Sequence, residues 1–278
     1  MRAVTAATLR AAPFLWGALG SAAAFVLVYL VFVRSYVGQL IDERAFAGAD
    51  AWKGVSLDFA HAFLNALPAL CVALACVAAL AIVSVRHNWR VFVVVVIAAA
   101  LANGSTQLLK YTILSRPAKG VDVGLSNSLP SGHTTVAASA ALVVFLLASP
   151  RFRPFAAVIG AVFSIAAGAS TLVEQWHRPS DVIAGLLVVA FWACAAGATL
   201  SWMRACTTEK PSRTRLWPLA LIAAVCAAGS AIALAVTYFS VQSGITHLFI
   251  AYVGGVAAIA ALGLGLAALG NRLFRALA

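Results

Sequence analysis

Eight uncharged apolar runs, each long enough to cross a bilayer as a helix, divide this chain of 278 residues. A bilayer core about 30 Å thick is spanned by about 20 mostly apolar residues. All 19 Lys and Arg and all 8 Asp and Glu lie outside the runs, as expected when a charge at mid-helix costs about 2.5–3.5 kcal/mol. The predicted spans are 13–33, 60–85, 91–109, 133–149, 155–173, 182–203, 216–239 and 248–269.

The predicted fold class is all-α, a polytopic transmembrane helical bundle. Hydrophobic residues make up 63% of the chain, above the roughly 45–50% of soluble domains, and the alternating strands of a membrane barrel are absent from the sequence pattern. The first run exceeds the about 7–15 residues of a signal-peptide core, so we expect it to remain as a span. The most polar inner connection suggests a division into residues 1–203, with six helices, and 204–278, a linker and two additional helices.

The net charge of +11 is spread over many short connections. This pattern indicates membrane orientation and no nucleic-acid partner. Twelve of the 19 Lys and Arg fall on the side of the N-terminus, so the positive-inside rule places both termini in the cytoplasm. The connections expected on the outer side are 34–59, 110–132, 174–181 and 240–247.

The first polar cluster, NSLPSGHTT, covers residues 127–135 in an outer connection. Proline suits the first helical position, so Pro130 is predicted to begin a helix. The amides of Ser131, Gly132 and His133 would then lack intrahelical partners and form an anion site at the positive end of the helix dipole. An ordinary capped helix start is the alternative.

The second cluster, LLKYTILSRP, covers residues 108–117. Lys110 and Arg116 share an outer connection with the first cluster, and two cations beside exposed amides suit a phosphate. A lysine that extends from a helix end to the membrane surface is the alternative for Lys110.

The third cluster, STLVEQWHRPSD, covers residues 170–181. Pro179 is predicted to start a helix with Asp181 in its first turn, where the carboxylate can reach back to His177. A histidine oriented in this way presents its other nitrogen as a base or nucleophile. A simple N-terminal capping acid is the alternative for Asp181.

These three clusters resemble the motifs of the type 2 phosphatidic acid phosphatase superfamily of membrane phosphatases, K-x6-R-P, P-S-G-H and S-R-x5-H-x3-D. The resemblance covers about residues 13–203, the six-helix phosphatase core, and leaves the last two helices without a role. Two departures stand out. Lys110 and Arg116 are separated by five residues, and Thr171 replaces the arginine of the third motif. Arg178 and Lys119 are the candidates to supply the missing cation.

The resemblance implies a metal-independent phosphatase without a cofactor. His177 would attack phosphorus, Asp181 would orient it, and His133 would protonate the leaving oxygen. The oxygens of the phosphoryl group would be held by Lys110, Arg116, Ser131 and Gly132. Ser170, Thr171 and Arg178 complete the predicted site.

The resemblance also implies a phosphorylated membrane lipid as the substrate, either a prenyl diphosphate, such as undecaprenyl diphosphate, or a phosphatidate-like lipid. The active site would lie on the extracytoplasmic face of the cell membrane. A lipid phosphotransferase and a non-catalytic membrane transport or binding protein are the alternatives. The sequence does not indicate an oligomeric state.

Overall fold

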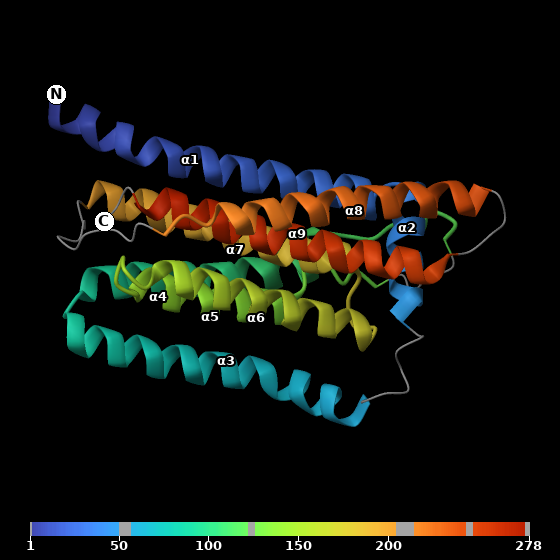
Figure 1. The fold of residues 1–278 in the computed structure, drawn as a ribbon, viewed down its shortest axis with the longest axis horizontal. Coiled ribbons are helices and arrows are strands. Elements are labelled where there is room, and N and C mark those ends of the chain that lie inside the picture. Colours follow the sequence, from blue (N-terminus) through green and yellow to red (C-terminus); the bar gives the residue numbers. More distant parts are fainter. Residues whose placement is uncertain (1, 50–56, 122–125, 204–213, 243–246, 276–278) are drawn as a thin grey trace.

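The computed structural model describes residues 2–49, 57–121, 126–203, 214–242 and 247–275. Within these ranges every regular element is a helix, which confirms the all-α fold (Figure 1). The elements are α1 (Arg2–Val28), the π-helix η1 (Tyr29–Val33), α2 (Tyr36–Ala47), α3 (Leu57–Arg86), α4 (Trp89–Leu108), the π-helix η3 (Leu109–Ile113), α5 (Gly132–Leu147), α6 (Arg153–Val173), α7 (Pro179–Trp202), α8 (Trp217–Gln242) and α9 (Leu248–Phe274).

All eight predicted spans lie on helices, and seven of the described helices are long and apolar enough to cross a membrane. The eighth, α5, has 16 residues and extends about 24 Å at 1.5 Å per residue. Its apolar side chains pack mainly against other helices. The chain is therefore a multi-pass membrane protein, with one short helix enclosed by longer ones.

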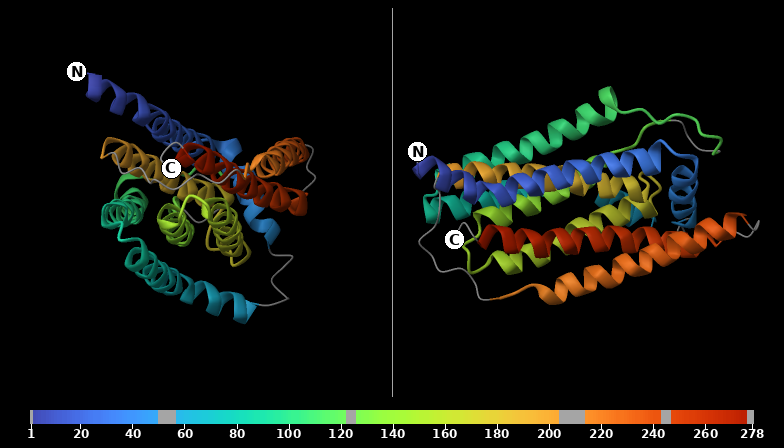
Figure 2. Two further views of the ribbon diagram at one scale, coloured as in Figure 1. Left: turned by 60° about the vertical axis from the view of Figure 1, so that its left-hand side comes forward. Right: turned by 90° about the horizontal axis from the view of Figure 1, so that it is seen from above.

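Helix α2 lies within the connection 34–59, for which no helix was predicted. Ser35 caps this helix, since its side chain accepts a hydrogen bond from the amide of Gly38 at 3.0 Å. Figure 2 shows α2 lying crosswise at one end of the bundle. The helix buries Gln39 and Asp42, so its polar side faces the protein.

Helix α7 lies at the centre of the bundle, packed against α1, α4, α5 and α9. Its approach to α5 is close at Gly185, where a Cβ atom would meet the Ser131 carbonyl oxygen at 3.0 Å and Thr135 Oγ1 at 3.2 Å. Helix α1 begins and α9 ends at the same end of the bundle (Figure 1). The opposite end holds the starts of α5 and α7.

The last two helices pack against the rest of the bundle. Helix α9 contacts α2, α6 and α7, and α8 packs on α9. At Gly255 of α9, a Cβ atom would lie 2.6 Å from Pro179 Cγ and 3.3 Å from Ala45 Cβ. Helix α9 therefore supports the first turn of α7. The proposed division of the chain at residue 203 stays a prediction.

Substitution of Gly255 by alanine is expected to destabilise the protein by about 1–3 kcal/mol, because the new methyl group overlaps the Pro179 ring. The matched control is Gly270→Ala on the same helix, where a Cβ atom meets nothing within 4 Å and alanine is expected to be neutral or stabilising. Thermal unfolding of both purified variants provides the measurement. Equal midpoints for the two variants would contradict the close contact.

Candidate active site

The start of α5 differs from the prediction for Pro130. The helix begins at Gly132, and Ser131 is its N-cap. Ser131 takes this position because its Oγ accepts hydrogen bonds from the Thr134 amide at 3.3 Å and from Thr134 Oγ1 at 3.0 Å. Proline has no side-chain acceptor for this role. Pro130 therefore precedes the cap instead of opening the helix.

The backbone of Ser131 joins the first and third clusters. Its amide donates to the carbonyl oxygen of Asp181 at 2.9 Å, so this N–H is not available to a ligand, contrary to the expectation. The next two amides, of Gly132 and His133, lie in the first turn and have no acceptor within the helix. At Gly132 a Cβ atom would meet only Gln107 Nε2, at 3.6 Å. The backbone is thus accessible to a bulky group on that side.

His177 and Asp181 lie together at the start of α7. The Nδ1 atom of His177 is 3.3 Å from Oδ2 of Asp181, and both side chains are buried. The same Oδ2 accepts a hydrogen bond from the Arg178 amide at 3.0 Å. Asp181 therefore caps the helix and orients the imidazole at once, which leaves Nε2 of His177 as the nitrogen not engaged by the carboxylate.

The turn before His177 is held by the backbone of Thr171. Its carbonyl oxygen accepts from the amides of Trp176 at 2.9 Å and His177 at 3.2 Å. Gln175 has φ 56° in this turn, a left-handed conformation that is uncommon for a residue other than glycine. The α6 end therefore positions His177 through main-chain bonds.

The two predicted histidines face the same space. The ring centroids of His133 and His177 are 6.3 Å apart, and Trp176 lies 5.1 Å from the His133 ring. The two imidazoles therefore lie next to each other, one in the first turn of α5 and one just before α7.

Arg116 is a buried cation near Asp181. Its side chain is 6% exposed, and none of its three guanidinium nitrogens has a hydrogen-bond partner in the described part of the chain. Arg178, Asp42, Asp181 and Glu43 are near enough to act on it electrostatically. Burial and then Arg178 lower the pKa of Arg116, whereas the three carboxylates raise it. A buried guanidinium without acceptors indicates a site for an anion.

Arg178 is held by α2. Its Nε donates to Oε2 of Glu43 at 2.7 Å, its Nη1 donates to Ser128 Oγ at 3.2 Å, and its guanidinium lies 5.2 Å from the ring centroid of Phe46. Of the two candidates for the missing cation, Arg178 is thus the one inside the site, and the side chain of Lys119 is exposed.

The other predicted residues make no direct contact with His177 or Asp181 through their side chains in the contacts described below. The hydroxyls of Thr171 and Ser170 donate back to their own helix, to the carbonyl oxygens of Gly168 at 2.7 Å and Ala166 at 2.8 Å. Lys110 lies on η3, half-buried, near enough to His133 for their charges to interact. In the described residues, no group of three or more His, Cys, Asp or Glu side chains is arranged to hold a metal ion.

Sequence analysis missed the contribution of α2, namely Asp42, Glu43 and their bonds to the start of α7. One signal was present. The chain has only 8 acidic residues, and two of them are adjacent in a connection that faces the same side as the three clusters.

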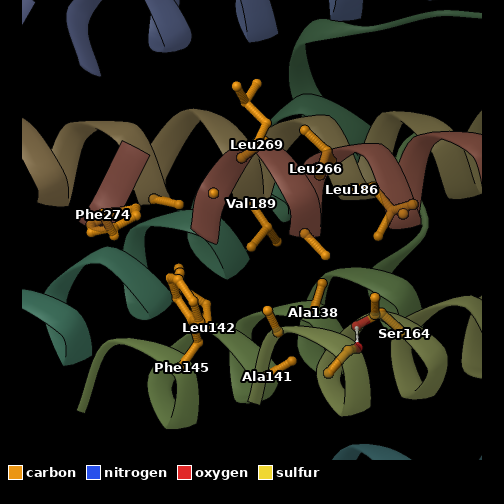
Figure 3. A pocket seen from close by; sticks show the side chains of 18 of the residues that line it. Ala138, Ala141, Leu142, Phe145, Ser164, Leu186, Val189, Leu266, Leu269 and Phe274 are labelled. Atoms are coloured by element: carbon orange, nitrogen blue, oxygen red, sulfur yellow. Dashed lines mark hydrogen bonds between the residues drawn. The ribbon is translucent and has the colours of Figure 1, made fainter. Parts of the chain in front are cut away.

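An apolar cavity of about 160 Å³ lies between helices of the bundle (Figure 3). It is lined by side chains of α1, α5, α6, α7 and α9. Ala138 and Leu186 border it, each five residues beyond His133 or Asp181, which is about 8 Å along a helix. None of the site residues lines it. The cavity therefore occupies the apolar layer below the site.

Fold and site together define an α-helical membrane protein in which two histidines lie close together at one end of the bundle. Residues 91–205 match the family model of the PAP2 superfamily. This part of the chain, which holds most of α4, all of α5 to α7 and all three clusters, is similar to the type 2 phosphatidic acid phosphatase superfamily. Members of this superfamily are generally phosphatases. Searches of curated proteins and of solved structures found no match.

Proposed function

We propose that this protein is a membrane lipid phosphatase that hydrolyses a phosphomonoester or diphosphate through a phosphohistidine on His177. The observation that carries the proposal is the buried Arg116 guanidinium, without a partner in the described residues, beside the His177–Asp181 pair. A phosphoryl group would supply the acceptors that this cation lacks, because its oxygens match a guanidinium in a bidentate arrangement.

The geometry supports a two-step reaction. In the first step Nε2 of His177 attacks phosphorus, the bond from phosphorus to the leaving oxygen breaks, and His133 gives that oxygen a proton. In the second step water attacks the phosphohistidine, His133 takes the proton, and inorganic phosphate leaves with His177 restored. Arg116, Arg178, Lys110 and the first amides of α5 would stabilise charge on the nonbridging oxygens.

A lipid substrate is supported by the position of the site. The starts of α5 and α7 lie at one end of a bundle of apolar helices, so a headgroup can enter while its chains stay in the bilayer. The apolar cavity below the site suits a hydrocarbon chain better than a polar one. A prenyl diphosphate, such as undecaprenyl diphosphate, or a phosphatidate-like lipid fits these features.

The proposed location is the cell membrane with the site on the extracytoplasmic face. This orientation rests on the excess of Lys and Arg in the connections on the side of the N-terminus. The start of α1 and the end of α9 lie together at the end of the bundle opposite the starts of α5 and α7 (Figure 1), which is the arrangement that this orientation requires.

The test is release of inorganic phosphate by the purified protein from a panel of lipid phosphates and diphosphates, in EDTA and without an added alcohol acceptor. We expect release of inorganic phosphate from at least one lipid. We also expect this release to persist in EDTA, because the proposed reaction uses no metal ion. Phosphate transfer only after an alcohol is added would instead identify a phosphotransferase. Failure with every lipid, with or without an acceptor, would favour the transport or binding alternative.

Within this assay, Arg116→Gln is expected to lower kcat/KM by about 10- to 100-fold, because a bidentate cation contributes about 1.5–3 kcal/mol. Arg178→Gln is expected to lower kcat/KM more than Lys119→Gln, since only Arg178 lies inside the site. Arg151→Gln, at an exposed residue at the other end of the bundle, serves as the control. Full activity of Arg116→Gln would remove the main support for the phosphoryl site.

A further inference from the structure

Helix α2 places a buried carboxylate beside the site that the proposed reaction does not use. Asp42 is 2% exposed. Its Oδ1 accepts a hydrogen bond from the Ser180 amide at 3.1 Å, and its Oδ2 accepts one from the Ser180 hydroxyl at 2.6 Å. Ser180 stands between Pro179 and Asp181, so this pair of bonds fastens α2 to the first turn of α7.

The charged groups around Asp42 belong to the proposed phosphoryl site. The field of Asp181 reaches it from α7, and the field of Arg116 reaches it from the segment after η3. Glu43 follows it on α2 and pairs with Arg178. The other elements that pack on α2, within their described residues, carry no carboxylate. Their ionisable side chains toward this end are the phenols Tyr29, Tyr238 and Tyr252.

Opposing interactions set the pKa of Asp42. Burial, followed by the negative charge of Asp181, raises the pKa of Asp42 to about 7, against the bonds from Ser180 and the charge of Arg116, which lower it. A phosphoryl dianion held by Arg116 would add negative charge and would also offset the charge of this arginine. Both effects favour the protonated form of Asp42.

We propose that Asp42 is a positioning residue that takes up a proton from solvent when a phosphoryl dianion binds beside Arg116. The proposal rests on the phosphoryl site described above. The proton taken up by Asp42 would offset part of the negative charge that the dianion brings to that site. The neutral carboxyl still holds the start of α7 through Ser180. Asp42 thereby acts through the helix that presents His177, without contact to the substrate.

The sign of the pH dependence follows from proton linkage. Below about pH 7 Asp42 is already protonated, so binding takes up little further proton. Above about pH 7 the free site has an ionised Asp42 and the occupied site a protonated one. The affinity for a dianion therefore falls as pH rises above about 7, by up to about tenfold per pH unit.

The test uses the purified full-length protein and tungstate, a tetrahedral dianion that does not itself titrate near neutral pH. Calorimetric titration at about pH 8 in two buffers of different ionisation enthalpy measures the protons taken up. We expect the wild-type protein to take up about 0.5–1 more proton per tungstate than Asp42→Asn, whose amide still bonds to Ser180, because proton uptake by the two histidines is common to both proteins. Arg151→Gln, at the exposed residue at the other end of the bundle, provides the control and is expected to keep the uptake.

The variant Ser180→Ala tests the same proposal without changing Asp42. It removes a hydrogen bond that lowers the pKa of Asp42, so the loss of tungstate affinity is expected to begin at higher pH. This test stands if Asp42→Asn fails to fold. Equal proton uptake in wild type and Asp42→Asn, or an unshifted profile for Ser180→Ala, would overturn the role of Asp42. Absence of tungstate binding to the wild-type protein would instead refute the phosphoryl site.

Discussion

Replacement of His177 by alanine is expected to reduce phosphate release by at least about 10⁴-fold, because the attacking nitrogen is lost. The loss is expected in kcat. An alkaline denaturing quench, which preserves the acid-labile P–N bond, after brief incubation with a lipid labelled in its phosphoryl group should leave a phosphohistidine label on the wild-type protein and none on His177→Ala.

Two companion variants separate chemistry from folding. His133→Ala is expected to lower the rate by about 10²–10⁴-fold, as for a general acid. His87→Asn is expected to retain activity, because His87 is exposed in the connection between α3 and α4 and asparagine tolerates its φ of 52°. A similar loss in all three variants would indicate damage to the fold and would withdraw the roles of both histidines.

The second large effect is expected for Asp181→Asn, with kcat lower by about 10³–10⁴-fold and KM little changed. An amide carries no negative charge to stabilise the positive charge that develops on the His177 ring across the 3.3 Å contact at Nδ1. The asparagine oxygen can still accept from the Arg178 amide, so the cap of α7 is retained.

The effect of Asp181 on His177 can therefore be measured separately from its effect as the cap of α7. Steady-state kinetics and thermal unfolding should be measured on the same preparation. We expect a large fall in kcat with an unfolding midpoint close to that of the wild type. A midpoint lowered in proportion to activity would show that Asp181 serves only as a helix cap, the alternative that its sequence position allows.

Local pattern was sufficient for most of the fold. The eight apolar runs all became helices, since the absence of charge over about 20 residues reflects the bilayer and needs no tertiary information. Pro179 opens α7 as expected. The error at Pro130 was local as well, because Ser131 competes for the cap and a helix can start two residues later without changing the pattern.

The site was predictable only in part, because sequence pattern reports contacts within one segment and not contacts between distant segments. The His177–Asp181 contact joins residues four apart, so it follows from the start of one helix. The unpartnered state of Arg116 and the loss of the Ser131 amide to Asp181 depend on which segments meet. Residue spacing along the chain carries no information about which distant segments pack against each other.

The amino-acid sequence alone was enough to establish a helical membrane protein with three polar clusters on one predicted side, because hydrophobic length and motif order are properties of short segments. Only the tertiary structure placed α2 against α7, with Glu43 and Arg178 separated by 135 residues and Asp42 and Ser180 by 138. Contacts over such separations depend on the packing of the whole bundle. For that reason the acidic side of the site became visible only in the folded chain.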